Sequence, residues 1–325
     1  MVEVYSEKNP ITMSNPSGNN PISVDQIKSG FAESGYICND DIAMTMFLAH
    51  QLEKPVLVEG PPGVGKTELA KATAHYLNYE LIRLQCYEGL DEAKALYEWK
   101  YGKQLLYTQV LKDKLGDLLK GAHGLAESID RLHEFGDIFY SEQFLEPRPL
   151  LQALQAEQGT VLLIDEIDKA DNEFESFLLE MLSDYQISIP EIGTIKAKRH
   201  PIVFLTSNNT RELSDALKRR CLHLFIPFPD ASLERNIIQS RVPDISEKLQ
   251  EQLVGFVQEV RKLDLKKQPA ISETIDWART LLLLHAEALT PELVSSTLNV
   301  LLKHEEDISN VKDDLRTLFN KLFKK

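Results

Sequence analysis

The sequence feature that most constrains the fold is a glycine-rich run, VEGPPGVGKTELA, which occupies residues 58–70. Within it, residues 60–67 fit the pattern G-x-x-x-x-G-K-[ST], in which backbone N–H groups surround phosphate oxygens, the lysine supplies a positive charge and the hydroxyl helps to hold Mg²⁺. Glycine is needed because a side chain would block the close approach of the phosphate. The predicted phosphate-binding residues are Gly60, Pro61, Pro62, Gly63, Val64, Gly65, Lys66, Thr67 and the adjoining Glu68. The alternative is that the run is only a sharp turn.

The residues on either side of this run favour the phosphate-binding interpretation. Residues 54–59 (KPVLVE) contain the short β-branched and apolar run of a buried strand. Residues 68–77 (ELAKATAHYL) repeat apolar residues at helical spacing. The sequence therefore predicts a strand, a loop and a helix, in the order that a phosphate loop requires.

Two adjacent acids follow a second apolar strand, in the stretch VLLIDEIDKAD. The strand is predicted at residues 161–164, and an acid at its carboxyl end is expected beside the phosphate loop. Asp165 is positioned to hold Mg²⁺ together with Thr67, and Glu166 to polarise an attacking water. Alone, the two acids would be equally consistent with a solvated strand end.

A third apolar run, predicted as a strand at residues 202–206, leads into the stretch TSNN. An amide at such a strand end is able to orient a water or contact a phosphate without adding charge, which suits Asn208, with Asn209 as the competing choice. An Asx turn is the alternative. Residues 216–221 (ALKRRC) then place three cations after a helix, a pattern that is also typical of a solvated helix end.

Strands alternate with helices up to about residue 229, which predicts an α/β fold with a mainly parallel sheet. After that point only helical periodicities remain, so the chain is divided into a flexible tail (1–22), an α/β nucleotide-binding domain (23–229) and an all-α lid domain (230–325). The other predicted elements are helices at 40–52, 105–119, 125–135 and 174–184, strands at 81–85 and 223–228, and a hairpin at 186–195.

Composition and charge narrow the function. The chain has 325 residues, and 36 basic against 50 acidic residues give a net charge of −14, which opposes approach to nucleic acid. No run of about 20 apolar residues and no basic, apolar leader is present in the sequence, so we expect a cytoplasmic protein without a membrane span. The three cysteines are far apart, and we expect them to be reduced, with no zinc site.

In their order, the motifs resemble those of the AAA+ ATPases: GPPGVGKT is similar to Walker A, LLIDEID to Walker B, TSNN to sensor 1, and ALKRRC to the segment that carries the arginine finger. The resemblance implies an AAA+ P-loop fold, ATP and Mg²⁺ as cofactors, ATP hydrolysis, and a homo-oligomeric ring, expected to be a hexamer. It also implies that Arg220, with Arg219 second, acts on ATP bound to the neighbouring subunit.

Three longer stretches are similar to the MoxR family, namely the insert before the Walker B strand, the hairpin YQISIPEIGTIKAKRHPI, and LTPELVSSTLNVLLKH. FAESGYICNDDIA, LIRLQCYEGLDEAKALYEW and SDALKRRC resemble especially the CoxD-like members, which are associated with carbon monoxide dehydrogenase and related molybdenum hydroxylases. This resemblance implies a chaperone that remodels or matures a protein client together with a von Willebrand factor A partner. The alternatives are a nucleotide-dependent scaffold with little turnover and a McrB-like or loader-type motor linked to nucleic acid.

The sequence departs from the family pattern in the lid. Family members often carry a sensor 2 arginine at the start of a lid helix, but here PAISETIDWAR places Ser272 and Glu273 there. Either Arg279 substitutes from the following turns or another group senses the nucleotide.

Overall fold

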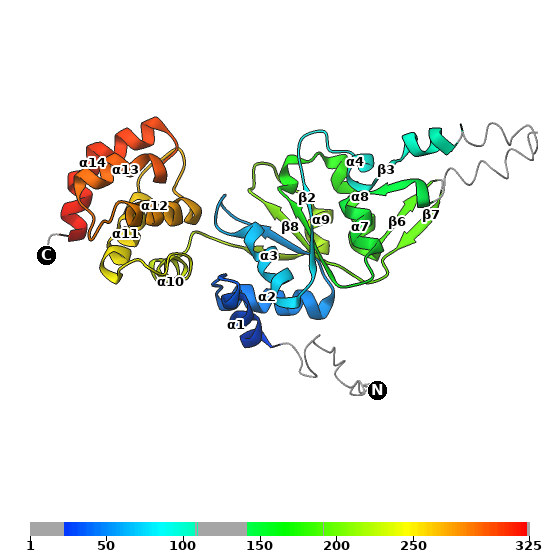
Figure 1. The fold of residues 1–325 in the computed structure, drawn as a ribbon, viewed down its shortest axis with the longest axis horizontal. Coiled ribbons are helices and arrows are strands. Elements are labelled where there is room, and N and C mark those ends of the chain that lie inside the picture. The colour runs from blue at the N-terminus through cyan, green and yellow to red at the C-terminus, as the bar shows by residue number, and fades with distance from the viewer. Residues whose placement is uncertain (1–22, 108, 110–141, 191, 324–325) are drawn as a thin grey trace, which may run out of the picture. The chain divides into compact units, whose positions relative to one another are not determined.

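The structure is a computed structural model that describes residues 23–107, 109, 142–190 and 192–323 (Figure 1). The predicted tail at residues 1–22, the predicted helix at 125–135 and residues 110–119 of the helix predicted at 105–119 lie outside these residues. The chain divides into two compact units, one made of residues 1–52, 58–79 and 224–325, the other of residues 53–57 and 80–223. Each unit is described by itself below.

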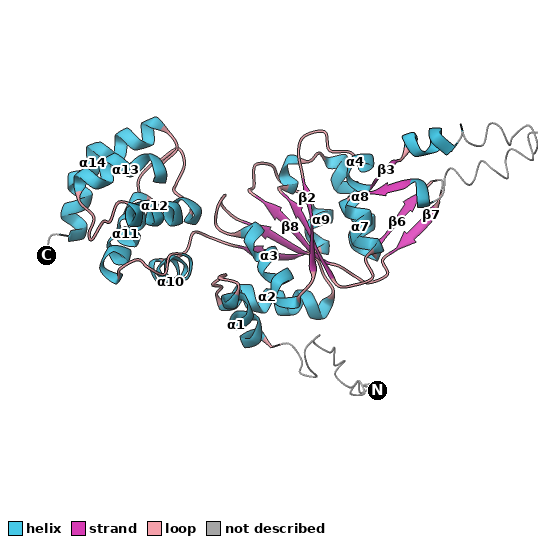
Figure 2. Ribbon diagram, in the orientation of Figure 1, coloured by secondary structure: helices cyan, strands magenta, loops and turns pink. Residues whose placement is uncertain are grey.

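The predicted parallel α/β sheet is confirmed (Figure 2). Five strands have the order β2-β5-β8-β1-β9, and β2 pairs in parallel with β5, as β5 does with β8. All residues of β5 are buried, as is typical of a central strand in a parallel sheet, whereas β2 is an edge strand whose residues are only partly buried. The strands are β1 (Val56–Glu59), β2 (Glu80–Gln85), β5 (Thr160–Asp165), β8 (Ile202–Ser207) and β9 (Leu222–Phe225).

The core of the unit that contains β5 lies between the sheet and two helices, α7 (Pro149–Gln155) and α8 (Asn172–Asp184). Leu162 of β5, Leu154 of α7 and Leu178 of α8 are fully buried there. The helix α8, expected from residue 174, begins at 172 because the Asp171 side chain accepts a hydrogen bond from the Phe174 N–H and caps the helix. Short elements complete this part: α4 (Glu92–Leu96), η1 (Glu142–Phe144), η2 (Ile167–Lys169) and α9 (Asp215–Arg220).

Two antiparallel strand pairs accompany the sheet. The predicted hairpin is confirmed as β6 (Gln186–Ile189) and β7 (Gly193–Lys196). The pair β3 (Tyr97–Trp99) and β4 (Leu145–Pro147) was not predicted, because each strand has only three residues and the partners are far apart in the sequence. The strand β9 ends at Phe225, not at 228 as predicted, and the next residues include Pro227 and Pro229, which lack the N–H that a ladder needs.

The helices of the other unit agree with the periodicity of the sequence. They are α1 (Val24–Glu33), α2 (Asp40–Leu52), α3 (Lys66–Leu77), α10 (Ala231–Arg241), α11 (Glu247–Val260), α12 (Ile271–Leu283), α13 (Pro291–Leu301) and α14 (Glu305–Phe323). The helices α11 to α14 share a core around Phe256 and Trp277, and the Trp277 indole N–H donates to Thr297 Oγ1 at 2.8 Å. The described residues after 230 contain helices alone, as expected for a lid, but the domain boundary at 229/230 stays a prediction because the compact units divide the chain elsewhere.

Candidate functional site

The glycine-rich run forms a loop between β1 and α3, in the predicted order of strand, loop and helix. Three of its glycines have positive φ angles: 150° at Gly60, 75° at Gly63 and 102° at Gly65. At Gly60 a Cβ atom would lie 2.2 Å from the carbonyl oxygen of Ile226, so no larger residue fits there. Lack of space and backbone conformation both explain Gly60, whereas backbone conformation alone explains Gly65.

The helix α3 begins at this loop without a side-chain cap, because its N-cap residue is Gly65. The N–H groups of its first turn are accordingly directed toward the loop, where the positive end of the helix dipole favours an anion. Lys66 is only 6% exposed, and its ammonium donates to the carbonyl oxygens of Gly60 at 2.6 Å and Pro61 at 2.8 Å. A buried cation and uncapped amides around a narrow loop have the chemistry of a phosphate site.

Other segments of the same unit contact this loop. A Cβ atom at Gly63 would lie 2.5 Å from Ala270 Cβ and 2.9 Å from Ser272 Oγ, so the beginning of α12 packs directly on the loop. Glu68, in the first turn of α3, accepts a hydrogen bond from Arg241 at 2.8 Å. Partial burial raises the pKa of Glu68, but hydrogen bonds from Arg241 and Lys71 outweigh burial, and the pKa lies below its usual value.

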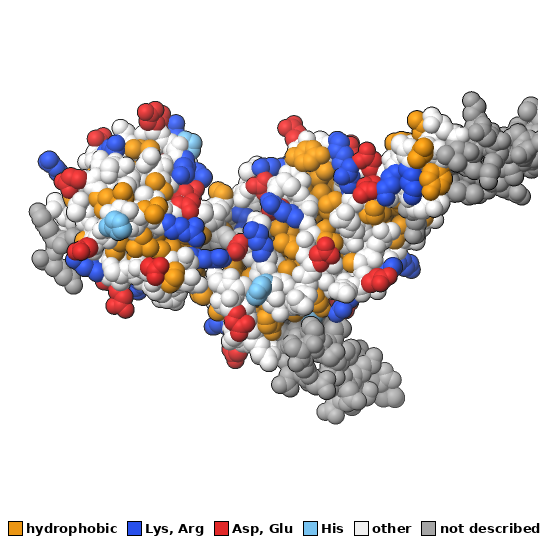
Figure 3. All heavy atoms as spheres, in the orientation of Figure 1, with side chains coloured by type: hydrophobic (Ala, Val, Ile, Leu, Met, Phe, Trp, Pro, Cys, Tyr) orange, Lys and Arg blue, Asp and Glu red, His pale blue; other side chains and the backbone are white. Residues whose placement is uncertain are grey.

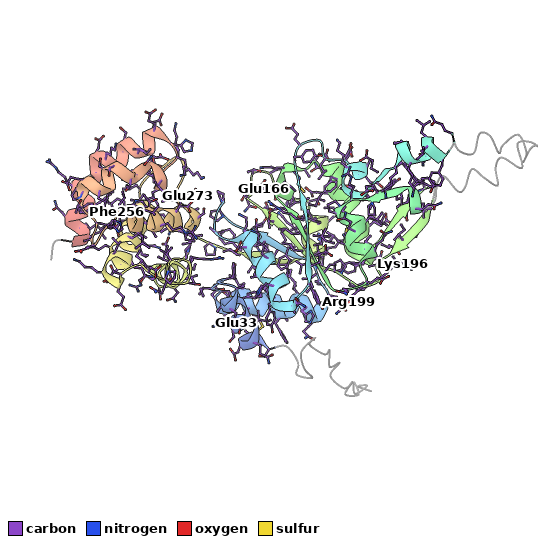
Figure 4. The ribbon with its side chains drawn as sticks, viewed as in Figure 1. Glu33, Glu166, Lys196, Arg199, Phe256 and Glu273 are labelled. Carbon is purple, nitrogen blue, oxygen red and sulfur yellow. The ribbon has the colours of Figure 1, made fainter. Side chains whose placement is uncertain are left out.

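In the other unit, the two predicted acids end β5 and begin the following turn. Asp165 is 3% exposed and accepts hydrogen bonds from the Thr206 hydroxyl and from Arg83, both at 2.5 Å. Glu166 (labelled in Figure 4) has left-handed backbone angles, φ 58° and ψ 49°. This sparsely populated conformation lets adjacent acids point in different directions, as two separate roles require.

The Glu166 carboxylate lies among three donors. It accepts from Lys169 at 2.6 Å, from Gln85 at 2.8 Å and from the Asn208 amide at 3.4 Å. The structure thus brings together Glu166 and Asn208, two residues that the sequence singled out separately.

The structure distinguishes Asn208 from Asn209. The Asn209 amide oxygen lies 3.4 Å from the Ser207 hydroxyl and its backbone has φ 58°, so this residue makes the turn. Asp168 holds the turn in place by accepting hydrogen bonds from the backbone of Asn208 and from both the backbone and the hydroxyl of Thr210. Burial raises the pKa of Asp168, but these hydrogen bonds outweigh it, and the pKa lies below its usual value.

The prediction that three cations follow a helix is wrong in detail, because Lys218, Arg219 and Arg220 form the last turn of α9 itself. The Ser214 hydroxyl caps the start of α9 by accepting a hydrogen bond from the Leu217 N–H. Arg220 donates to the Ser183 hydroxyl of α8 and to the Ala216 carbonyl oxygen, while Arg219 is exposed. Arg220 is therefore anchored by Ser183 and Ala216 of the same chain and not by Asp165 or Glu166.

Comparison with protein families decides the class. The family described as AAA domain (dynein-related subfamily) matches residues 55–221, about half of the chain, from before β1 to the end of α9. The chain belongs to this AAA family. Members of the family in general bind and hydrolyse nucleotides, in agreement with the phosphate loop and the acids described above.

The AAA protein also has relatives and structural neighbours at lower similarity. An uncharacterized protein of Staphylococcus epidermidis is 26% identical over 239 residues, which cover 71% of this chain and 77% of that protein. An uncharacterized protein of Staphylococcus aureus is 28% identical over 238 residues, which cover 71% of this chain and 76% of that protein.

Two solved structures resemble the fold. A point mutant of Thermotoga maritima RuvB has a TM-score of 0.47 at 17% identity over 93% of this chain and 83% of that one. The T. maritima RuvB Holliday junction branch migration motor has a TM-score of 0.44 at 18% identity, over 90% and 76%. Neither likeness indicates what this AAA protein acts on.

The lid position that departs from the family pattern lies beside the phosphate loop. Glu273 caps the start of α12, and its Oε2 atom is 3.7 Å from the Cβ position built at Gly63. Arg279 lies six residues further along, roughly 9 Å along the helix axis, and it pairs with Asp276 at the exposed surface. Of the two alternatives, the contacts of this AAA protein therefore favour a group other than Arg279.

Several contacts of the candidate site in this AAA protein were not predicted from the sequence. Arg83 and Gln85 are two residues apart on the edge strand β2, so they share the face of the strand that reaches Asp165 and Glu166. The alternation of side chains along a strand predicts that Arg83 and Gln85 lie on one face. Only the pairing of Gln85 with Asp165 across the sheet shows that this face meets Asp165 and Glu166. No pattern in the sequence predicts the contact of Arg241 with Glu68, because the two residues lie on helices that are far apart in the sequence.

Among the residues that the structure describes, no group of three or more histidine, cysteine, aspartate and glutamate residues is arranged to hold a metal ion. The free thiols Cys38, Cys86 and Cys221 have their pKa values raised by burial, to about 11, 12 and 12. Among the same residues, no helix has both the length and the apolar character needed to cross a membrane.

Proposed function

We propose that this AAA protein binds ATP with Mg²⁺, hydrolyses it, and uses the cycle to remodel a protein client. The observation that carries the proposal is buried Lys66 at the beginning of an uncapped helix, inside a loop where Gly60 and Gly63 leave no room for a side chain. An ammonium and several backbone amides suit the oxygens of a polyphosphate, and they fit neither an apolar ligand nor a cation.

The proposed roles follow from the chemistry of each group. On nucleotide binding, Lys66 would exchange its bonds to Gly60 and Pro61 for bonds to phosphate oxygens, and Thr67 and Asp165 would hold the magnesium ion. Bound Mg·ATP supplies the phosphoryl group that is transferred to water. Glu166 orients the attacking water, and Asn208 fixes the carboxylate through its amide.

The test is nucleotide binding and steady-state ATP hydrolysis by the full chain and matched variants. Lys66→Ala is expected to abolish nucleotide binding, whereas Lys71→Ala, a charge loss on the exposed face of the same helix, leaves it intact. Glu166→Gln is expected to bind Mg·ATP and to stop hydrolysis. Ordinary ATP affinity in the Lys66 variant would refute the phosphate-loop assignment, and normal turnover in the Glu166 variant would refute the role of that acid.

We further propose that the protein is a MoxR-type chaperone of the CoxD-like group, works as a ring with a von Willebrand factor A partner, and matures a metalloenzyme such as a molybdenum hydroxylase. The similar segments quoted above support this proposal. The net charge of −14 supports a protein client over a nucleic acid, and on the face seen in Figure 3 basic side chains are interspersed with acidic ones.

Co-purification with a von Willebrand factor A protein encoded nearby, and the metal-cofactor content of the hydroxylase in cells carrying Glu166→Gln, test this finer proposal. Loss of the cofactor in those cells is expected. ATP hydrolysis stimulated by DNA would instead favour the motor, and tight ATP binding with negligible turnover in the presence of the partner would favour the scaffold.

A further inference from the structure

The feature that carries a further inference is a carboxylate beside the phosphate loop. Glu273 is largely buried, with 14% of its side chain exposed, and it caps α12 by accepting from the Ala270 N–H at 3.2 Å and the Ser272 hydroxyl at 2.9 Å (Figure 4). Its Oε2 atom is 3.7 Å from the Cβ position at Gly63. An anion held at this point repels a polyphosphate, so a site that binds one needs a compensating cation nearby.

Lys267 supplies that cation. Its ammonium is 3.4 Å from Glu273 Oε1, which is longer than the 2.7–2.9 Å typical of a charge-assisted hydrogen bond. Burial raises the pKa of Glu273, but the Ser272 hydrogen bond and the charge of Lys267 outweigh burial, so the carboxylate stays ionised beside the loop. The Lys267 ammonium is therefore attracted to the Glu273 carboxylate beside the loop, but no short hydrogen bond fixes it there.

The backbone of Lys267 is held firmly. The buried carboxylate of Asp307 accepts from the backbone N–H groups of Lys266 at 2.9 Å and Lys267 at 3.2 Å. Arg261 donates to the Pro269 carbonyl oxygen at 2.8 Å. The chain before α12 is therefore anchored from two other helices, while the flexible lysine stem leaves the ammonium free to change partners.

We propose that Lys267 is a second phosphate-binding cation, which leaves Glu273 and contacts the phosphate chain when a nucleotide occupies the loop. The inference rests on the proposed function, because it requires a nucleotide at Lys66. Lys267 lies outside the sequence motifs described above. In this proposal it supplies the positive charge near the start of α12 that Glu273 cannot provide.

The experiment measures the Kd of Mg·ATP by titration calorimetry in the full chain carrying Glu166→Gln, so that the nucleotide stays intact. Adding Lys267→Ala is expected to weaken binding about tenfold to a hundredfold, the loss typical of one charge-assisted hydrogen bond. The matched control is Lys266→Ala, which removes the same charge one residue away, where the ammonium pairs with Glu306. We expect it to change the Kd by no more than about twofold, a bound that separates local contact from long-range attraction. Lys267→Arg is expected to retain most of the affinity.

Glu273→Gln separates contact with the nucleotide from neutralisation of Glu273, because glutamine also caps a helix at this position. If Lys267 contacts phosphate, Lys267→Ala weakens binding in the Glu273→Gln background as well. An effect of Lys267→Ala that disappears in that background, or that equals the effect of Lys266→Ala, overturns the inference. If the Glu166→Gln parent fails to bind Mg·ATP at all, the proposed nucleotide function itself falls, which is a distinct result.

Discussion

At the scale of single residues, each of the two acids already has a cationic partner in this structure. Arg83 is bound to Asp165 Oδ2, and Lys169 to Glu166 Oε2. The buried Asp165 carboxylate would be costly without a partner, so its pair with Arg83 stabilises it. The same pair competes with any other cation that is to bind Asp165.

Arg83→Gln is therefore expected to have two effects. It lowers the free energy of unfolding of the free protein by about 1–2 kcal/mol, below the range for a fully buried pair because Arg83 is half exposed. It also lowers the Mg²⁺ concentration needed for half-maximal ATP hydrolysis, because one competitor for Asp165 is gone. Denaturation curves and Mg²⁺ titrations measure these effects, with Arg148→Gln, whose partner Glu98 is exposed, as the control. An unchanged Mg²⁺ dependence would show that Arg83 does not compete with the metal.

At the scale of elements, the β6–β7 hairpin was predicted from the sequence and α9 was not, and the contacts of both were found only in the structure. Arg220 is held at the end of α9 by Ser183, so a finger role requires a neighbouring subunit to present its nucleotide there. In the hairpin, Ile187 and Ile189 are buried in the core, so β6 supports the unit as well as carrying an exposed tip.

Arg220→Ala is expected to bind ATP normally and to lose about 10³–10⁵ in turnover, the range of fingers in other phosphoryl-transfer systems. Lys218→Ala, on the same helix turn, should retain activity. Activity of the unmodified chain should rise with protein concentration, and Glu166→Gln subunits, which retain Arg220, should partly rescue Arg220→Ala subunits in mixtures. Absence of both rescue and concentration dependence would contradict a site shared between subunits.

We expect the two strands of the hairpin to have different roles, with buried β6 stabilising the unit and exposed β7 contacting a client or partner. Ile187→Ala is expected to destabilise the protein by about 2–5 kcal/mol through a cavity in the core. Lys196→Glu, on the exposed side of β7, should preserve stability and ATP binding but weaken the complex with a client or partner. Urea denaturation and co-purification distinguish the two effects, and a fully retained complex in the Lys196 variant would contradict a contact role for β7.

At the scale of the whole molecule, several carboxylates link stability to pH in the same direction. Asp168, Glu68 and Glu273 all have pKa values below their usual ones, so the folded chain binds their protons less tightly than the unfolded chain does. Their contribution is therefore complete above the unfolded pKa values near 4 and is lost as the pH falls below them.

We expect the free energy of unfolding to be nearly constant from about pH 7 to 5 and to decrease below about pH 4. Asp168→Asn, which cannot ionise, should lower stability at pH 7 and make the decrease below pH 4 shallower. Urea denaturation at a series of pH values measures both. An identical acid slope in the variant would show that Asp168 does not contribute to this linkage.

The sequence by itself determined the local part of this protein. Glycine spacing, apolar periodicity and the acids after VLLI predicted the phosphate loop, most strands and helices, and the residues Lys66, Asp165, Glu166 and Asn208, because these signals lie within a few residues of one another. Contacts between segments distant in the sequence were decided only by the tertiary structure. The pairing of β2 with β5 brings Arg83 and Gln85 to the acids, and the packing of α12 on Gly63 brings Glu273 and Lys267 to the loop. Such contacts depend on which strands pair and how helices pack, and both are decided by residues that are far apart in the sequence.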